Sequence, residues 1–322
     1  MTPRSIGHAI VLGRACLDLY ASPVGISLVD ARTFDAHLGG SPANIAVGLA
    51  RLGVPVAMAT CVAPDRVGAF VRKRLEAFGI DTTYVRDAPG TQTSVVLGAF
   101  EPPEGFDLVF YRDRAADLAL ETGNVSPQAL IDASLVVTSG TGLSALPSRQ
   151  ATLEALATAG SGSGVRAFVV DHRPAAWRAA EPDEIAAQYR RAIRSSDVVI
   201  GNSMEIALAS ENSDWRLGAR DVARDGASVV VVTRGAQGSA VLVDGELTEI
   251  PAAPARAANV VGAGDAFAAS FLYSLLNGAD AVASARFGAA AAAIVVERHA
   301  CSSAMPTEPE IVDRLSQGRG DT

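Results

Sequence analysis

The most informative stretch of the sequence is NVVGAGDAFAASFLYSLL, residues 259–276, in which a glycine-rich turn runs directly into a long apolar helix. Gly262 and Gly264 have no side chain, so they allow the backbone to approach a ligand closely. The amides of Gly262, Ala263 and Gly264 are expected to point out of the helix N-terminus, where the helix dipole attracts anions. The stretch therefore predicts an anion-binding turn ahead of a buried helix.

Asp265 follows this turn and falls in the first turn of the predicted helix. A carboxylate beside an anion site can take a proton from a hydroxyl that attacks a phosphoryl group. The amides of the turn would then stabilise the charge on the transferring group. The alternative is that Asp265 only caps the helix, and the stretch taken alone leaves both interpretations open.

A second glycine-rich helix start is GGSPANIAVGLARLG, residues 39–53. We expect a helix over residues 42–52 with Ser41 as its N-cap and a proline at its first position. Asn44 projects from the first turn, and its amide can hold vicinal hydroxyl groups. Asn is also common near helix starts, so this motif is weak by itself.

Two further motifs follow apolar strands. TRGAQGS, residues 233–239, resembles a short nucleotide-phosphate turn. In NSME, Asn202 and Glu205 are three residues apart, so they can share one helix face and hold a hydrated Mg²⁺. A helix-capping arrangement of the same two side chains is the alternative.

Short apolar runs alternate with helical patterns along most of the chain. Nearly continuous apolar strands are typical of a parallel sheet that is covered by helices on both faces. Ligands bind at the carboxyl ends of such strands, where the motifs above are found. The predicted strands are residues 9–14, 56–62, 135–140, 167–171, 197–202 and 228–235.

Two segments, residues 17–38 and 93–112, interrupt this alternation. They contain strand-like runs without intervening helices, and residues 94–100 and 107–112 have the pattern of a hairpin. We interpret them as a small β-sheet beside the main domain that could cover a cleft. An ordinary extension of the sheet edge is the alternative.

Composition excludes several classes of protein. The chain has 322 residues with 27 basic and 35 acidic side chains, and no basic stripe that would indicate nucleic-acid binding. Lys73 is the only lysine, so there is no GxxxxGK[ST] loop and no candidate for the strand lysine of protein kinases. The first strand is not followed by the G-x-G-x-x-G of dehydrogenases, and the G-x-S-x-G elbow of serine hydrolases does not occur.

The three cysteines, Cys16, Cys61 and Cys301, are far apart and suggest neither disulfide nor metal spacing. We expect them to be small buried side chains in a reducing compartment. The N-terminus has too short an apolar stretch for a signal peptide, and no apolar span reaches membrane length. The sequence therefore predicts a cytoplasmic protein with no membrane association.

Taken in this order, the motifs resemble those of the ribokinase or PfkB family of carbohydrate kinases. The resemblance covers about residues 9–296 and depends on GGSPANIAVGLARLG and NVVGAGDAFAASFL. It implies an α/β, ribokinase-like fold, with a Rossmann-type, mainly parallel sheet, helices on both faces and a small β-sheet lid. It also implies a single kinase domain over residues 1–322, with lid segments at about 17–38 and 93–118.

The family resemblance further implies roles for individual residues. Asp265 would be the catalytic base, and Gly262, Ala263 and Gly264 would form the anion hole. The remaining implied residues are Thr233, Gly235 and Gly238 for ATP, Asn202 and Glu205 for Mg²⁺ through water, and Asp18, Gly40 and Asn44 for the acceptor.

One departure from the family pattern concerns K⁺, which family members often need near the glycine-rich turn. Many members have D-T-x-G-A-G-D, whereas this chain has Asn259 and Val260 in the first two positions. Asn is a weaker cation ligand than Asp, so K⁺ dependence stays open.

A narrower resemblance is to the 5-dehydro-2-deoxygluconokinases of this family, which act in myo-inositol catabolism. The segments that carry it are GRACLDLY, LGGSPANIAV, VFYRDRAADL, DHRPAAW and NVVGAGDAF. Their acceptor has a carboxylate, so Arg14, Arg112 and Arg173 are candidates to bind it, with ordinary ion pairs as the alternative. RAADL departs from the expected K-A-P-D pattern, which leaves the exact acceptor open.

The alternatives within the family are kinases of 2-keto-3-deoxygluconate, fructose or ribose. A non-catalytic sugar- or nucleotide-binding protein on the same fold is a further alternative, although binding alone does not need Asp265. The expected partner is a small sugar or sugar acid, and neither nucleic acid nor a membrane is expected to bind. A homodimer with its interface on the lid is possible.

Overall fold

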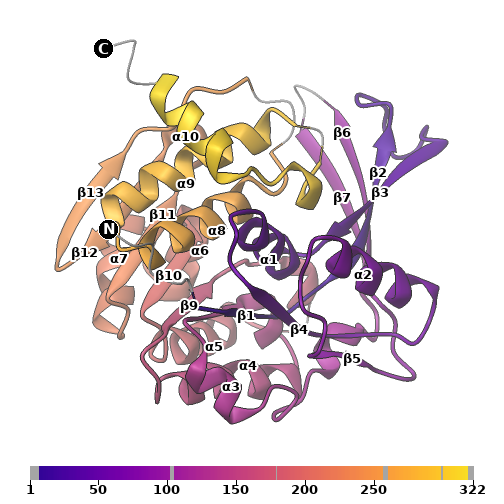
Figure 1. Cartoon of the computed structure of the whole chain (residues 1–322), viewed down its shortest axis with the longest axis horizontal. Coiled ribbons are helices and arrows are strands. Elements are labelled where there is room, and N and C mark those ends of the chain that lie inside the picture. The colour runs from indigo at the N-terminus through magenta and orange to yellow at the C-terminus, as the bar shows by residue number, and fades with distance from the viewer. Residues whose placement is uncertain (1–6, 102–104, 179, 257–259, 299, 318–322) are drawn as a thin grey trace.

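The computed structural model describes residues 7–101, 105–178, 180–256, 260–298 and 300–317 (Figure 1). Within them, the main sheet has nine strands in the order β13-β12-β11-β10-β9-β8-β1-β4-β5. All neighbours from β11 to β5 pair in parallel, which confirms the predicted class of sheet. The strands are β1 (Ala9–Leu12), β4 (Val56–Val62), β5 (Val85–Asp87), β8 (Leu135–Ser139), β9 (Val165–Val169), β10 (Val198–Asn202), β11 (Val229–Thr233), β12 (Ser239–Val243) and β13 (Glu246–Ile250).

Helices cover both faces of this sheet (Figure 1), because side chains of successive strand residues point to opposite sides. Val11 packs on one face and Ile10 on the other, each within a separate buried cluster. The face of Val11 holds α1 (Ser41–Arg51), α2 (Arg66–Ala77), α8 (Ala263–Leu276), α9 (Ala281–Val296) and α10 (Glu308–Gln317). The opposite face holds α3 (Pro127–Asp132), α4 (Ser148–Ala159), α5 (Pro182–Ile193), α6 (Ser203–Ser210) and α7 (Trp215–Arg224).

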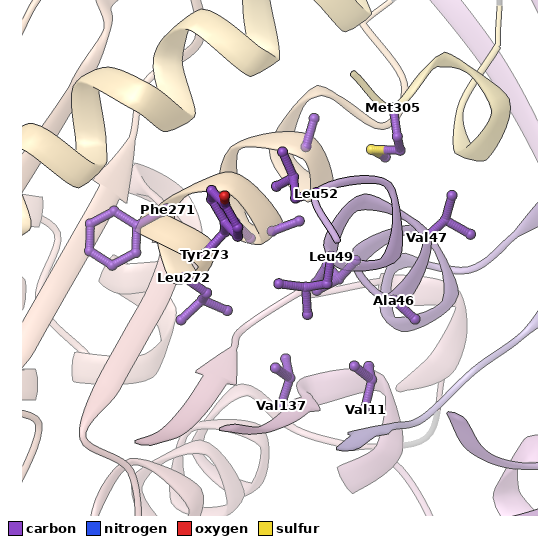
Figure 2. Close-up of a cluster of buried hydrophobic side chains, with 14 of the residues drawn as sticks. Val11, Ala46, Val47, Leu49, Leu52, Val137, Phe271, Leu272, Tyr273 and Met305 are labelled. Atoms are coloured by element: carbon purple, nitrogen blue, oxygen red, sulfur yellow. The ribbon is translucent and has the colours of Figure 1, made fainter. Parts of the chain in front are cut away.

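Helices α1 and α8 pack closely above the centre of the sheet. Figure 2 shows Leu49 of α1 and Leu272 of α8 above Val11 and Val137 of the strands. The close approach depends on Gly48, because a Cβ atom there would lie only 2.6 Å from Cβ of Ala269. This packing brings the N-terminal turns of the two helices together, and both turns carry predicted site residues.

A second, four-stranded sheet lies beside the main one (Figure 1), in the order β3-β2-β6-β7. Its strands are β2 (Cys16–Ser22), β3 (Thr33–Gly39), β6 (Val95–Glu101) and β7 (Gly105–Tyr111). β2 pairs antiparallel to β3 and parallel to β6, and β6 and β7 form an antiparallel hairpin. We call this sheet the lid.

Two local features differ from expectation. The N-cap of α1 is Gly40, with φ +97°, and not Ser41, whose hydroxyl is used elsewhere. Strands β12 and β13 form an antiparallel hairpin that the parallel pattern did not predict. Its turn is Asp244-Gly245, both with positive φ, which is the usual two-residue turn of such hairpins.

The described parts of the chain contain no helix that is both long and apolar enough to cross a membrane. Cys16, Cys61 and Cys301 are buried free thiols. Lys73 lies exposed on α2.

Candidate active site

Polar residues gather at the carboxyl edge of the main sheet, because its parallel strands all end there. Arg14 follows β1, Asp171 follows β9, Asn202 ends β10 and Thr233 ends β11. The charges of Arg14 and Asp171 are close enough to influence each other, and Asp171 also influences Asp265 on α8. The edge therefore brings together residues from distant parts of the sequence, as the predicted topology requires.

The carboxylate of Asp265 is held by two side chains of the other glycine-rich helix start. Ser41 Oγ donates a hydrogen bond of 2.6 Å to Oδ1, and Asn44 Nδ2 donates one of 2.8 Å to Oδ2. Asn44 was predicted near the acceptor, whereas Ser41 was not predicted to touch the base. The two donors fix the carboxylate at the N-terminus of α8.

Removal from water raises the pKa of Asp265 to about 6, and the negative charge of Asp171 acts in the same direction. The hydrogen bonds from Ser41 and Asn44 and the positive charge of Arg173 oppose this rise. A carboxylate with a pKa near 6 is still ionised at neutral pH and is a stronger proton acceptor than an ordinary aspartate. This combination is typical of a catalytic base.

A groove of about 600 Å³ lies next to Asp265 on the glycine-rich turn. Its volume is in the range of small-ligand pockets. Three predicted ATP residues line it together with two residues of the predicted anion hole: Thr233, Gly235, Gly238, Ala263 and Gly264. Residues from β11, the loop before β12 and the start of α8 therefore share one cavity.

The other walls of this groove are apolar. They are formed by Phe267 of α8, by α9 and by the segment after β13, and the described lining includes no lysine or arginine. Phe267 and the small side chains suit the flat face of a nucleobase. The remaining lining residues are Ala236, Ser239, Ala252, Ala253, Pro254, Ala255, Val260, Ala289, Ala292, Ala293 and Val296.

The glycine-rich turn leaves room for an anion at the N-terminus of α8. Gly262 is the N-cap with φ +81°, in the left-handed region that favours glycine. A Cβ atom on Gly264 would meet no atom within 4 Å, so open space lies in front of this residue. The amide of Ala263 makes a long contact of 3.4 Å with the carbonyl oxygen of Val260.

Asn202 and Glu205 form a capping box at the start of α6. Asn202 Oδ1 accepts from the Glu205 amide at 2.9 Å, and Glu205 Oε2 accepts from the Asn202 amide at 2.7 Å. The other oxygen of Glu205 accepts from the His172 amide at 2.8 Å. The capping alternative is thus realised, while each carboxylate oxygen retains a further lone pair for water.

The side-chain oxygens of Asn202, Glu205 and Asp171 are suited to bind a hydrated Mg²⁺. Burial raises the pKa of Glu205, and the negative charge of Asp171 raises it further, so a cation would relieve repulsion between these carboxylates. Asp171 Oδ1 is buried and makes no hydrogen bond. No group of three His, Cys, Asp or Glu side chains in the described ranges is arranged to bind a metal directly. This favours Mg²⁺ held through water and phosphate oxygens, as is usual for this ion.

Asp171 is the residue that sequence reasoning missed. It is buried, has φ +37°, and accepts a long hydrogen bond of 3.4 Å from Thr141 Oγ1. Arg173 Nη2 lies 3.0 Å from its Oδ1, although the angle is too poor for a hydrogen bond. Its place directly after an apolar strand, in the sequence AFVVD, was the available signal.

Asp18 lies on the inner side of the lid and packs against the glycine-rich motif of residues 39–53. Its carboxylate accepts from Tyr20 at 2.9 Å and from the Cys16 thiol at 3.2 Å, and burial raises its pKa. A Cβ atom on Gly39 would lie 2.0 Å from Asp18 Oδ1, and one on Gly40 would lie 2.4 Å from the carbonyl oxygen of Arg14. The paired glycines therefore allow β2 and α1 to meet at the site.

The three candidate arginines have different surroundings. Arg112 forms a buried ion pair with Asp117, which also accepts from Ser94 at 3.1 Å. Arg173 is half exposed beside Asp171. Arg14 is buried without an ion pair of this kind.

Asn259, the residue on which the expectation about K⁺ depends, lies outside the described residues.

The fold and this edge of the sheet define a nucleotide-dependent small-molecule kinase with a lid. The model of the pfkB family of carbohydrate kinases matches residues 7–308. The chain belongs to this family and is a carbohydrate kinase.

Curated relatives make the likeness more specific. The chain is 36% identical over 316 residues to 5-dehydro-2-deoxygluconokinase of Geobacillus kaustophilus, with 96% of this chain and 94% of the relative covered. It is 34% identical over 307 residues to the enzyme of the same name from Bacillus subtilis, with 94% of each covered.

Solved structures share the ribokinase-like fold. Fructokinase from Xylella fastidiosa with bound ATP superposes with a TM-score of 0.86 at 23% identity, over 97% of this chain and 99% of that one. A putative ribokinase II from E. coli in complex with ATP and Mg²⁺ superposes with a TM-score of 0.87 at 22% identity and the same coverage. The predicted fold class is therefore confirmed.

Proposed function

We propose that this kinase transfers the γ-phosphoryl group of ATP to the terminal hydroxyl of 5-dehydro-2-deoxy-D-gluconate, a step of myo-inositol catabolism. The observation that carries the chemistry is the Asp265 carboxylate, held by Ser41 and Asn44 at the N-terminus of α8 and beside a nucleotide-sized groove. The names of the curated relatives and the buried side chains of Arg14 and Arg112 support the acidic acceptor.

In this proposal, Asp265 takes the proton of the attacking hydroxyl. Ser41 and Asn44 orient its carboxylate and keep it ionised at neutral pH, because both donate to the charged form. Asp18, Gly40 and Asn44 hold the acceptor, whose carboxylate faces the cluster of Arg14, Arg112 and Arg173.

The nucleotide occupies the groove lined by Thr233, Gly235 and Gly238, with its phosphates toward the amides of Gly262, Ala263 and Gly264. Glu205 and Asn202 orient the water shell of Mg²⁺. When bound, Mg²⁺ neutralises charge on the phosphate oxygens. K⁺ is a weak activator in this proposal, because Asn259 takes the place of the usual aspartate.

The lid also offers a surface for a second copy of the chain, so we include a homodimer in the proposal. The face of the lid that bears Leu19, Leu97 and Val109 is continuous, because these residues are directly paired across β2, β6 and β7. Val109 is 40% exposed and Tyr111 on the same face is 60% exposed. An apolar sheet face of this kind is normally covered by another surface.

We further propose that the whole chain acts as one catalytic domain in the cytoplasm, with residues 17–38 and 93–118 as its lid. The three free thiols suit a reducing compartment.

The test of the proposed function is an acceptor screen with purified enzyme, ATP and Mg²⁺. We expect kcat/KM for 5-dehydro-2-deoxy-D-gluconate to exceed the values for 2-keto-3-deoxygluconate, fructose and ribose. If fructose or ribose has the higher kcat/KM, the acidic acceptor is wrong and a general sugar kinase is left.

A further inference from the structure

Arg14 is a buried cation whose hydrogen-bonding capacity is almost unused. Its side chain follows β1 at the carboxyl edge of the sheet and is only 5% exposed. Its Nε atom has no hydrogen-bond partner, and Nη1 makes a single long contact of 3.7 Å with the Cys16 thiol. Among the described residues, no carboxylate oxygen lies within the 4.0 Å of its nitrogens that would make an ion pair.

Three carboxylates surround Arg14 at longer range, and all are engaged by other groups. Asp18 accepts from Cys16 and Tyr20. Asp117 is bound by Arg112 and Ser94, and Asp171 by Arg173 and Thr141. These negative charges keep the guanidinium ionised and raise its pKa despite burial, but they leave its N–H groups free.

Burying a guanidinium without partners costs free energy, which a bound anion would recover. A carboxylate suits this group, because its two oxygens match two parallel N–H donors. Arg112 and Arg173 are less suited, since each already faces a carboxylate of the protein.

Arg14 is also connected to the proposed catalytic base through the glycine-rich motif of residues 39–53. Its carbonyl oxygen packs against Gly40, and Gly40 accepts from the Asn44 amide at 2.8 Å. Asn44 in turn donates to Asp265. The side chain of Arg14 lies under the lid, with its guanidinium 5.7 Å from the ring centre of Phe110 on β7. The backbone of Arg14 therefore lies beside the helix start that holds Asp265, while its guanidinium faces the lid, under which the proposed acceptor would lie.

We propose that Arg14 is the residue that binds the carboxylate of the acceptor and so determines the preference for a sugar acid over a neutral sugar. This inference rests on the proposed function and adds to it the residue responsible for discrimination. A neutral acceptor lacks the ionic hydrogen bonds to Arg14. It also leaves the buried guanidinium unpaired, which costs further free energy and strengthens the discrimination against it.

The experiment compares 5-dehydro-2-deoxy-D-gluconate with its primary amide, which is neutral and of nearly the same shape. In the wild type, we expect kcat/KM for the acid to exceed that for the amide about 10- to 150-fold, the range given by a hydrogen bond to a charged group. Arg14→Gln should reduce this ratio to about one, mainly through a higher KM for the acid. Arg14→Lys, which keeps the charge but not the planar pair of donors, should retain part of the ratio.

Arg112→Gln and Arg173→Gln serve as comparisons and should largely preserve the acid-to-amide ratio, even where they lower activity on both. Arg66→Gln, at an exposed position of α2, controls for the loss of one positive charge. The inference is overturned if Arg14→Gln preserves the ratio, or if it lowers kcat/KM for acid and amide equally, which would indicate a structural role.

Failure of the proposed function has a different signature, because the wild type would then not phosphorylate the acid. In that case, calorimetry with D-gluconate on the wild type and Arg14→Lys decides whether Arg14 binds sugar acids. Equal binding to both proteins, or none to the wild type, would overturn the inference. Thermal unfolding of each variant identifies any that fails to fold.

Discussion

Asn44 of α1 and Asp265 of α8 are joined by a hydrogen bond of 2.8 Å, although 221 positions separate them in the sequence. One helical turn further along each helix, Gly48 and Ala269 are in contact. The two contacts form a single row, because residues four apart lie on the same helix face. Close packing of the two helices therefore holds Asp265, the proposed catalytic base, against the proposed acceptor site.

The first prediction concerns Asp265 itself. Asp265→Asn should lower kcat on the order of 10²- to 10⁴-fold, because it removes the general base. Binding of ATP and acceptor, measured by calorimetry, should change little. Asp313→Asn, on the exposed side of α10, is the matched control and should keep full activity. A variant at Asp265 that retains more than about half of the wild-type kcat would rule out this role.

The second prediction is a pH profile with an acidic limb near 6. Asp265 works as a base only when ionised, and its pKa is raised to about 6, so kcat should fall as the pH drops through this value. Ser41→Ala removes a donor to the ionised form and should move the limb to higher pH, by about one unit. Asp171→Asn removes a like charge and should move the limb to lower pH. A limb that shifts in the same direction in both variants would contradict this electrostatic account.

The third prediction concerns metal ions. Chelation of Mg²⁺ should abolish activity, whereas replacing K⁺ with a large organic cation should lower it only slightly. Glu205→Gln should raise the Mg²⁺ concentration needed for half-maximal rate, because the carboxylate loses its charge. Glu184→Gln, on the surface of α5, should not. A strict requirement for K⁺ would show that Asn259 does not weaken the monovalent-cation site.

The fourth prediction separates activity from stability within α8. Gly264→Ala should fold normally, since its new methyl group meets no protein atom, and should stabilise the helix by about 0.4–1 kcal/mol. The methyl group enters the space in front of the turn, so kcat/KM for ATP should fall about 5- to 150-fold, equivalent to ~1–3 kcal/mol of overpacking.

Gly278→Ala, just after the other end of α8, should instead lower stability and leave the kinetics unchanged. Gly278 has φ +85° and lies far from the groove, so the substitution should lower stability by about 1 kcal/mol and leave kcat/KM unchanged. Thermal unfolding and steady-state kinetics on both proteins check the pair. Normal kinetics for Gly264→Ala would place the phosphates elsewhere.

The fifth prediction concerns the lid. Analytical ultracentrifugation should find the wild type as a dimer, and Val109→Glu as a monomer, because the interface would have to bury an unpaired charge. Val312→Glu, on the exposed side of α10, is the control and should leave the dimer intact. A wild type that sediments as a monomer would disprove the lid interface.

The main sheet was predictable because its strands are continuous apolar runs that a parallel sheet buries on both faces. The strand over residues 56–62, for example, has the same bounds in sequence and structure. The hairpin of β12 and β13 was not predicted, because its only local signal is the two-residue turn Asp244-Gly245 and its strands have five residues each.

The candidate site was predictable only in part. Glycine-rich turns ahead of helices can be recognised in the sequence, because clustered glycines indicate a backbone with positive φ or a close approach to a ligand. The donors around Asp265 were not visible, since Ser41 looks like an ordinary helix cap and its actual partner depends on how α1 packs against α8. Asp171 was missed for a similar reason. A single carboxylate after a strand is common, and its closeness to Arg173 and Asp265 depends on the folded structure.

The glycines at the meeting point of lid, α1 and α8 also bear on how the protein tolerates mutation. A methyl group would lie 2.0 Å from Asp18 at Gly39, 2.4 Å from the Arg14 carbonyl oxygen at Gly40 and 2.6 Å from Ala269 at Gly48. Backbone amide donors, by contrast, are supplied by every residue except proline, so few substitutions delete them. Inactivating mutations at these three glycines should therefore act by adding atoms, so that even a glycine-to-alanine change is harmful there. Sequence drift would be confined to positions whose side chains point away from the junction.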